Sequence, residues 1–266
     1  EYGDWRPHPE RFPNGLAPVK KKLEEYGMRL GLWMSPFTVS KKSEVYKAHP
    51  EWLVKDKSGN IILGQGKNPV MCIMSPFFDY LVNTCKRLID EGATYFKWDG
   101  INDDFCYSAV HNHGDNKYEG EERAERYGYG MILAFTKAAK ILTEYNPDVV
   151  IVYDVTEKAK SNIGLSFWSE ARYFWMNNGA SWYGDLSKYR TKSIRSIAFN
   201  YNQIIPTVLQ TAAVYPHNSK IYGAMRYNIN TTLLGTNGIW GDLSEMSERD
   251  REYVNSITKI YKKVIE

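Results

Sequence analysis

The sequence predicts an α/β fold, specifically a (β/α)8 barrel whose first strand is absent from this chain. Strand-like and helix-like segments alternate along all 266 residues, which is typical of a parallel sheet. No glycine-rich fingerprint follows a first strand, which argues against an open dinucleotide-binding sheet. Polar residues instead gather at the carboxyl ends of many expected strands. They are Ser35, Asp99, Asp154, Asn177, Asn178, His217, Asn218 and Asp242. A barrel collects such residues around one mouth.

In the first part of the chain, apolar runs predict strands and amphipathic stretches predict the helices between them. The expected strands are 29–36, 69–75, 93–100 and 149–154, and the expected helices are 17–27, 76–92 and 131–145. Gly27 and Gly92 sit where a glycine commonly ends a helix, and Pro76 sits where a proline commonly starts one. The polar segment 41–68 is expected to be a loop that contributes little core.

The second part continues the alternation. Three further strands are expected at 171–178, 212–218 and 238–243, with helices near 189–203 and 222–234. The chain closes with a helix that Ser247 should cap, with Asp250 three residues on as in a capping box.

Composition excludes several classes of function. The net charge of +3 with 24% charged residues predicts no nucleic-acid partner. No run of 18 apolar residues occurs, so no spanning helix and no membrane partner are expected. Cys72, Cys85 and Cys106 are unevenly spaced, and the segment 111–115 has no matching ligand cluster, so neither disulfides, a metal nor a cofactor is predicted. The 20 Tyr, 8 Trp and 10 Phe suit a carbohydrate partner or an aromatic core.

Lys97 and Asp99 are the first candidates for chemistry. Two residues apart on a strand, they project to the same side, which at the end of a barrel strand is the mouth. The ammonium is expected to hold Asp99 ionised, so the carboxylate is either a nucleophile for an anomeric carbon or half of a structural ion pair. A Schiff-base role for Lys97 is a third alternative.

Retaining glycoside cleavage also needs a second carboxyl group about 5–5.5 Å away, which protonates the leaving oxygen. It must come from another strand end or loop. The candidates are Asp154, Glu157, Glu170, Asp185 and Asp242, and spacing does not choose among them.

Three stretches together resemble a known family. "FPNGLAPVKKKLEEYGMRLGLWMSP", "SEVYKAHPEW" and "SPFFDYLVNTCKRLIDEGATYFKWD" follow one another as in the catalytic barrel of glycoside hydrolase family 36, the α-galactosidases and α-N-acetylgalactosaminidases. The resemblance runs from about Asp4 to Asp99, and a weaker similarity continues to the end of the chain. It implies that Asp99 is the nucleophile, that Lys97 contacts the sugar, that Trp33 is a pocket wall, and that Asp4 and Trp5 lie near the substrate.

The resemblance also implies an overall activity and setting. The expected activity is retaining hydrolysis of terminal α-galactosides or α-N-acetylgalactosaminides in an oligosaccharide or glycoconjugate, without a cofactor. Residues 1–266 would be one catalytic barrel within a longer protein with flanking β-domains, and oligomerisation through those domains stays open.

Two segments depart from the family pattern. The loop that usually resembles C-S-G-G-G-G-R is "VTEKAKSN" (155–162), and the acid/base motif W-T-S-D-D is replaced by "YFWMNNG", with Asn177 and Asn178 in place of the acid. Both asparagines, with Trp182, are expected to contact substrate. Asp185 is the preferred replacement acid, ahead of Glu170 and Glu157, although its charge would also suit a helix N-terminus.

The sequence also yields expectations for three aromatic residues at strand ends and for two alternative activities. Trp175, Tyr215 and Trp240 are expected in the core rather than in the pocket. A transglycosylase and a barrel that binds glycans without cleaving them remain alternatives to hydrolysis.

Overall fold

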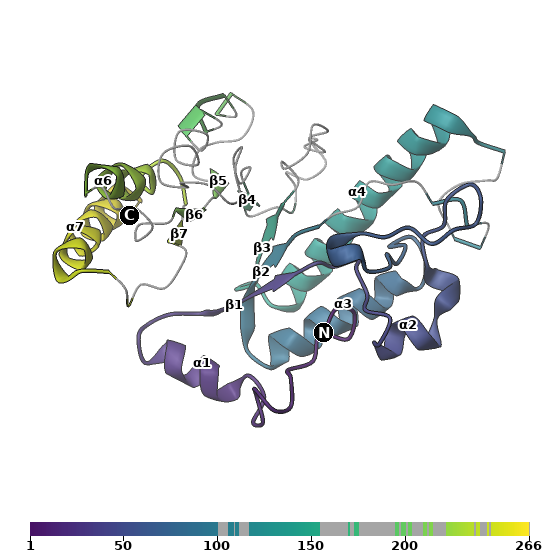
Figure 1. Cartoon of the computed structure of the whole chain (residues 1–266), viewed down its shortest axis with the longest axis horizontal. Coiled ribbons are helices and arrows are strands. Elements are labelled where there is room, and N and C mark those ends of the chain that lie inside the picture. Colours follow the sequence, from purple (N-terminus) through teal and green to yellow (C-terminus); the bar gives the residue numbers. More distant parts are fainter. Residues whose placement is uncertain are drawn as a thin grey trace. The chain divides into compact units, whose positions relative to one another are not determined.

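A computed structural model describes most of the first half of the chain and parts of the second (Figure 1). The described residues are 1–100, 106–108, 110–111, 117–154, 170, 173–175, 195–196, 198–200, 202–203, 210–211, 213–214, 222–236, 238–239, 244 and 246–265. They belong to two compact units. One comprises Glu1–Tyr153 and Ile163–Arg172, and the other comprises Asp154–Asn162 and Tyr173–Glu266.

The first unit is built on parallel strands connected through helices. β1 (Leu30–Met34) pairs with β2 (Ala93–Trp98), and β2 pairs with β3 (Val150–Tyr153). α3 (Phe77–Asp90) links β1 to β2, and α4 (Gly120–Tyr145) links β2 to β3, while α1 (Ala17–Glu24) precedes β1. This strand–helix alternation confirms the predicted α/β class.

The register of the three strands separates two faces of this sheet. Met34, Trp98 and Tyr153 are neighbours across it, and all are fully buried. Phe135 of α4 packs on this face, with its ring 4.8 Å from Trp98 and 5.4 Å from Tyr153 between centroids. Side chains alternate along a strand, so the neighbouring row, Trp33, Lys97 and Val152, belongs to the opposite face.

The segment between β1 and α3 corrects two expectations. The strand expected at 69–75 is wrong, because Pro69, Val70 and Met71 make only isolated antiparallel bridges before the chain turns into α3. Segment 41–68 was also wrongly expected to lack core: Val45, Leu53 and Val54 are buried, and the segment contains α2 (Glu44–Ala48), η1 (Pro50–Trp52) and η2 (Gln65–Lys67). We call residues 37–72 the β1–α3 excursion.

The second unit contains two short parallel strand pairs and two helices. β4 (Tyr173–Trp175) pairs with β5 (Gln210–Thr211), and β6 (Ala213–Val214) pairs with β7 (Gly238–Ile239). α6 (Tyr222–Thr231) and α7 (Glu248–Ile265) pack together through Ile229 and Ile257, and Figure 1 shows them side by side. The Ser247 hydroxyl accepts the Asp250 amide at 3.2 Å, which confirms the predicted cap, while β5 was not predicted.

Among the described residues, no helix has both the length and the apolar character needed to cross a membrane.

Phe135→Ala should lower the free energy of unfolding by about 3–5 kcal/mol, because it leaves a cavity between α4 and the buried face of the sheet. Urea denaturation measures this. Leu133→Ala is the matched control on the same helix, since Leu133 is 46% exposed and its loss should cost within about 0.5 kcal/mol. Equal losses in the two variants would contradict this account of the core.

Candidate active site

Asp99 directly follows β2 and extends its hydrogen bonding, since its amide donates to the Met34 carbonyl at 2.8 Å. Its carboxylate receives three donors. Trp33 Nε1 lies 2.7 Å and Lys97 Nζ 2.9 Å from Oδ2, and the Gly100 amide lies 2.5 Å from Oδ1. The side chain of Asp99 is 16% exposed and that of Lys97 10%. The structure therefore brings together Asp99, Lys97 and Trp33, three of the predicted site residues.

Strand register explains this convergence. Trp33 and Lys97 are direct partners between β1 and β2, and Asp99 lies two residues beyond Lys97 on the same side. The ammonium compensates the carboxylate charge at low exposure, where a charge-assisted hydrogen bond is about twice as strong as a neutral one. The result is a carboxylate whose orientation is fixed from two strands.

An aromatic cluster of Tyr2, Trp5 and Trp33 adjoins this carboxylate. The ring centroids are 5.6 Å apart for Tyr2 and Trp5, 6.0 Å for Tyr2 and Trp33, and 6.3 Å for Trp5 and Trp33, all edge to face. Burial, followed by the negative charge of Asp99, raises the pKa of Tyr2, so its phenol stays protonated. Tyr2 was missed in the sequence, where its only signal is its position three residues before Trp5. We call these three side chains the aromatic wall.

Both oxygens of the Asp4 carboxylate accept hydrogen bonds from other residues of the chain. Oδ2 accepts the Glu44 amide at 2.8 Å, while Oδ1 accepts the Val45 amide and the Tyr80 hydroxyl, each at 3.2 Å. Burial, then the charge and hydrogen bond of Asp4, raises the pKa of Tyr80 to about 12. Asp4 thus binds the N-terminus of α2, and a direct contact of its side chain with substrate stays a prediction.

Backbone contacts place Trp5 in the wall. The Arg87 guanidinium donates to the carbonyls of Asp4 at 3.0 Å and Trp5 at 3.1 Å. Trp5 itself has a φ of 48°, which is uncommon for a residue with a side chain. The anchored turn therefore holds Trp5 in a conformation that the isolated chain would disfavour.

Gly100 joins the Asp99 carboxylate to the β1–α3 excursion. Its φ is +64°, and a Cβ atom there would meet Ser35 Oγ at 2.8 Å and Gln65 Cβ at 3.3 Å. Ser35 is fully buried and its hydroxyl donates to Thr38 Oγ1 at 2.7 Å, so it cannot easily move away. The turn after Asp99 accordingly requires glycine for both its backbone angle and its close packing.

The remaining residues singled out in the sequence are either buried, close to a buried tyrosine or outside the described residues. Asp154 follows β3 and is buried, and the Glu170 charge adds to burial in raising the pKa of Tyr153. Trp175 is buried, in agreement with its expected place in the core. The others lie outside the described residues, namely Glu157, Asn177, Asn178, Trp182, Asp185, Tyr215, Trp240 and Asp242.

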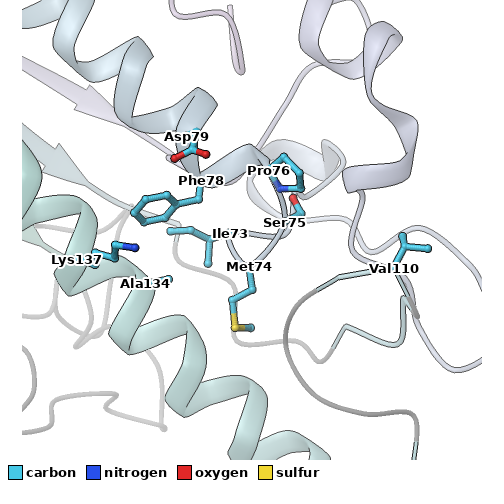
Figure 2. Close-up of a pocket in the computed structure, with 9 residues that line it drawn as sticks. All are labelled: Ile73, Met74, Ser75, Pro76, Phe78, Asp79, Val110, Ala134 and Lys137. Atoms are coloured by element: carbon cyan, nitrogen blue, oxygen red, sulfur yellow. The ribbon is translucent and has the colours of Figure 1, made fainter.

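A separate cavity of about 540 Å³ lies where the start of α3 meets α4 (Figure 2). Its lining includes Met74, Phe78, Asp79 and Lys137, and none of the residues around Asp99. Lys137 Nζ lies 5.3 Å from the centroid of the Phe78 ring. This cavity is therefore separate from the group of side chains around Asp99.

Gly100→Ala should destabilise the fold by about 1–2 kcal/mol for the left-handed backbone and by a further ~1–3 kcal/mol for the contact with Ser35. Gly27→Ala is the matched control, because Gly27 has a φ of +66° with nothing within 4 Å of an added Cβ. Urea denaturation of both variants compares them. Equal losses would show that the close packing of Gly100 carries no cost.

Comparison with known proteins shows which family this chain is similar to. A family model described as Melibiase matches residues 1–266. The chain is 34% identical to α-galactosidase AgaA of Geobacillus stearothermophilus over 100 residues, 36% of this chain and 13% of that protein. It is 23% identical to α-galactosidase Mel36A of Lactobacillus acidophilus over 274 residues, 99% of this chain and 34% of that protein. A Flavonifractor plautii protein, the A type blood α-D-galactosamine galactosaminidase, is 29% identical over 139 residues, 47% of this chain and 13% of that protein.

Solved structures confirm the predicted barrel fold. The α-galactosidase from Lactobacillus brevis matches with a TM-score of 0.76 at 21% identity, covering 98% of this chain and 33% of that one. A variant of GH36 α-galactosidase AgaA in complex with raffinose matches with a TM-score of 0.74 at 22% identity, covering 99% of this chain and 35% of that one. The chain spans about a third of the length of these proteins. With its whole length matched by the family model, the chain belongs to the Melibiase family.

Proposed function

We propose that the protein is a retaining glycoside hydrolase that cleaves terminal α-galactosides or α-N-acetylgalactosaminides through a covalent intermediate on Asp99. The observation that carries this proposal is the convergence of Lys97 Nζ and Trp33 Nε1 on one oxygen of a carboxylate at the end of a parallel strand. Family membership supports it. Residues 1–266 form one catalytic barrel of a longer protein in this proposal.

The donor pattern suggests which oxygen attacks. Oδ2 accepts both side-chain donors, which occupy its two lone pairs, whereas Oδ1 accepts only the Gly100 amide among the contacts described. We assign nucleophilic attack on the anomeric carbon to Oδ1. The bond from that carbon to the leaving oxygen breaks as the bond to Asp99 forms.

Proton transfer completes both steps. A second carboxyl group protonates the leaving oxygen, and the resulting carboxylate then removes a proton from the water that releases the sugar from Asp99. We propose Asp185 for this role. Two inversions at the anomeric carbon give net retention of configuration.

The aromatic wall and the relatives support the sugar class. Trp33 is 36% exposed and offers an apolar surface beside the carboxylate, which suits the less polar face of a pyranose. AgaA variants have been solved with raffinose and with stachyose, and the name of the Flavonifractor protein extends the class to galactosamine. Substrate contacts are proposed for Asp4, Trp5, Trp33, Lys97, Asn177, Asn178 and Trp182.

Covalent trapping tests the nucleophile. The full-length protein incubated with a 2-fluoro α-galactosyl probe that carries an excellent leaving group should gain the mass of one fluorosugar, mapped to Asp99. The leaving group departs without acid assistance, so the assignment of Asp185 does not affect this result. Asp99→Asn should abolish labelling, whereas Asp79→Asn, which alters a carboxylate in the separate cavity, should retain it.

Other results would redirect the assignment. Measurable sugar binding without an adduct would favour a barrel that binds glycans without cleaving them. An adduct that sugar acceptors release faster than water does would favour a transglycosylase. An adduct on another carboxylate would overturn the role of Asp99.

Trp33→Phe should lower kcat on an aryl α-galactoside about ten- to a hundredfold, because it removes a hydrogen bond to a charged acceptor worth ~1.5–3 kcal/mol while keeping an aromatic ring. Steady-state kinetics measure it. Trp52→Phe removes an indole that stacks on His49 rather than contacting Asp99, and should leave kcat unchanged. An unaltered kcat in Trp33→Phe would mean that this donor serves only the fold.

A further inference from the structure

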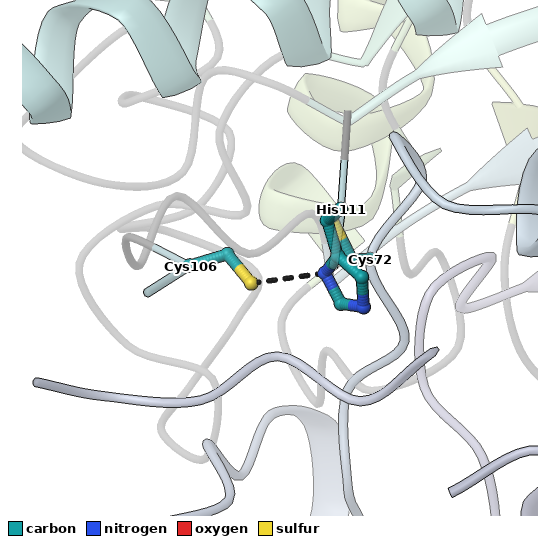
Figure 3. A group of neighbouring side chains, drawn as sticks. All are labelled: Cys72, Cys106 and His111. Atoms are coloured by element: carbon teal, nitrogen blue, oxygen red, sulfur yellow. Dashed lines mark hydrogen bonds between the residues drawn. The ribbon is translucent and has the colours of Figure 1, made fainter. Parts of the chain in front are cut away.

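Two buried cysteines and a histidine lie close together (Figure 3). The sulfur atoms of Cys72 and Cys106 and a ring nitrogen of His111 all lie within 4.8 Å of one another. Both cysteines are fully buried and His111 is 6% exposed. Among the residues that the structure describes, this is the one group of three such side chains close enough to share a metal ion.

The hydrogen bonds of His111 prepare it as a ligand. Nε2 lies 2.7 Å from the Glu51 carbonyl, which can only accept, so Nε2 carries the ring proton. Nδ1 then presents its lone pair towards Cys106 Sγ, 3.2 Å away. Metal-binding histidines are commonly oriented in this way by a carbonyl on the far nitrogen.

We propose that Cys72, Cys106 and His111 bind a zinc ion through two thiolates and one imidazole. Bonds of about 2.3 Å to sulfur and about 2.0–2.1 Å to nitrogen place tetrahedral ligands about 3.5–3.8 Å apart, so small side-chain shifts would complete the geometry. Sulfur and imidazole donors together favour zinc over magnesium or calcium, which prefer oxygen. The three residues supply three of the four tetrahedral positions.

Charge and proton balance are consistent with the site. Burial, and then the neighbouring Cys106, raise the pKa of the Cys72 thiol, so without a cation this thiol stays protonated. Binding one Zn²⁺ releases two thiol protons, and two thiolates balance the charge of the ion. The Arg123 guanidinium fixes the backbone at this ligand, since it donates to the Cys106 carbonyl at 2.8 and 3.1 Å.

The ion would cross-link segments that are distant in sequence. Cys72 ends the β1–α3 excursion, while Cys106 and His111 belong to the connection from β2 to α4, which begins at Asp99. The Tyr107 amide already donates to the Lys55 carbonyl at 2.8 Å between the same segments. The ion would thus link these two segments, and the proposal does not depend on the proposed hydrolase activity.

Metal analysis of the full-length protein, purified without a chelating tag, tests the proposal. Mass-spectrometric elemental analysis should find about one zinc per chain in the wild type. Cys106→Ser and His111→Gln should lose it. Cys85→Ser is the matched control, because Cys85 is an equally buried cysteine in α3 outside the group, and it should keep the metal.

A second measurement covers variants that fail to fold. Wild-type protein stripped of metal and loaded with Co²⁺ should show thiolate-to-cobalt charge transfer and the intense visible bands of tetrahedral cobalt. Folded wild-type protein that holds no zinc and takes up no cobalt would overturn the proposal. So would a Cys72–Cys106 disulfide in the unreduced protein, detected by peptide mass, which would make the pair a redox site instead.

Discussion

The register between β1 and β2 is the constraint on which the rest of the site depends. It sets Trp33 beside Lys97 and leaves Asp99 one step beyond the strand, so that two donors from two strands reach the same oxygen. A shift of one residue would turn Lys97 towards Phe135 and its neighbours, where a charge would be buried among aromatic rings. The apolar packing on one face therefore secures the polar geometry on the other.

Much of the first unit could be predicted from local signals. α3 begins just after Pro76 and ends just before Gly92, as expected, because both residues restrict or permit backbone angles independently of their surroundings. The apolar run at 69–75 gave no such signal. Val70 and Met71 are buried although they pair only through isolated bridges within the excursion and not in the sheet, and an apolar run alone does not distinguish these cases. β5 is two residues long and carries no periodic pattern.

The site was predictable where its residues are close in sequence. Asp99 directly follows the strand that carries Lys97, so their spacing alone indicated that they meet. The donation from Trp33 depends on pairing across the sheet, and the place of Tyr2 depends on an N-terminal turn anchored by Arg87, so neither follows from local spacing. Cys72, Cys106 and His111 likewise have no ligand-like spacing and meet only because the chain connections fold together.

The two halves of the site differ in what holds them. Lys97 and Trp33 come from paired strands, whereas Tyr2 and Trp5 come from a turn that the excursion secures through Ser40 and Glu44. Loops accept insertions and substitutions far more readily than paired strands do. Evolution could therefore replace Tyr2 and Trp5, and with them part of the proposed sugar contacts, while Asp99 and its donors Trp33 and Lys97 stay unchanged. In a hydrolase of the proposed kind, this division would let a lineage acquire new sugar substrates without rebuilding the catalytic carboxylate.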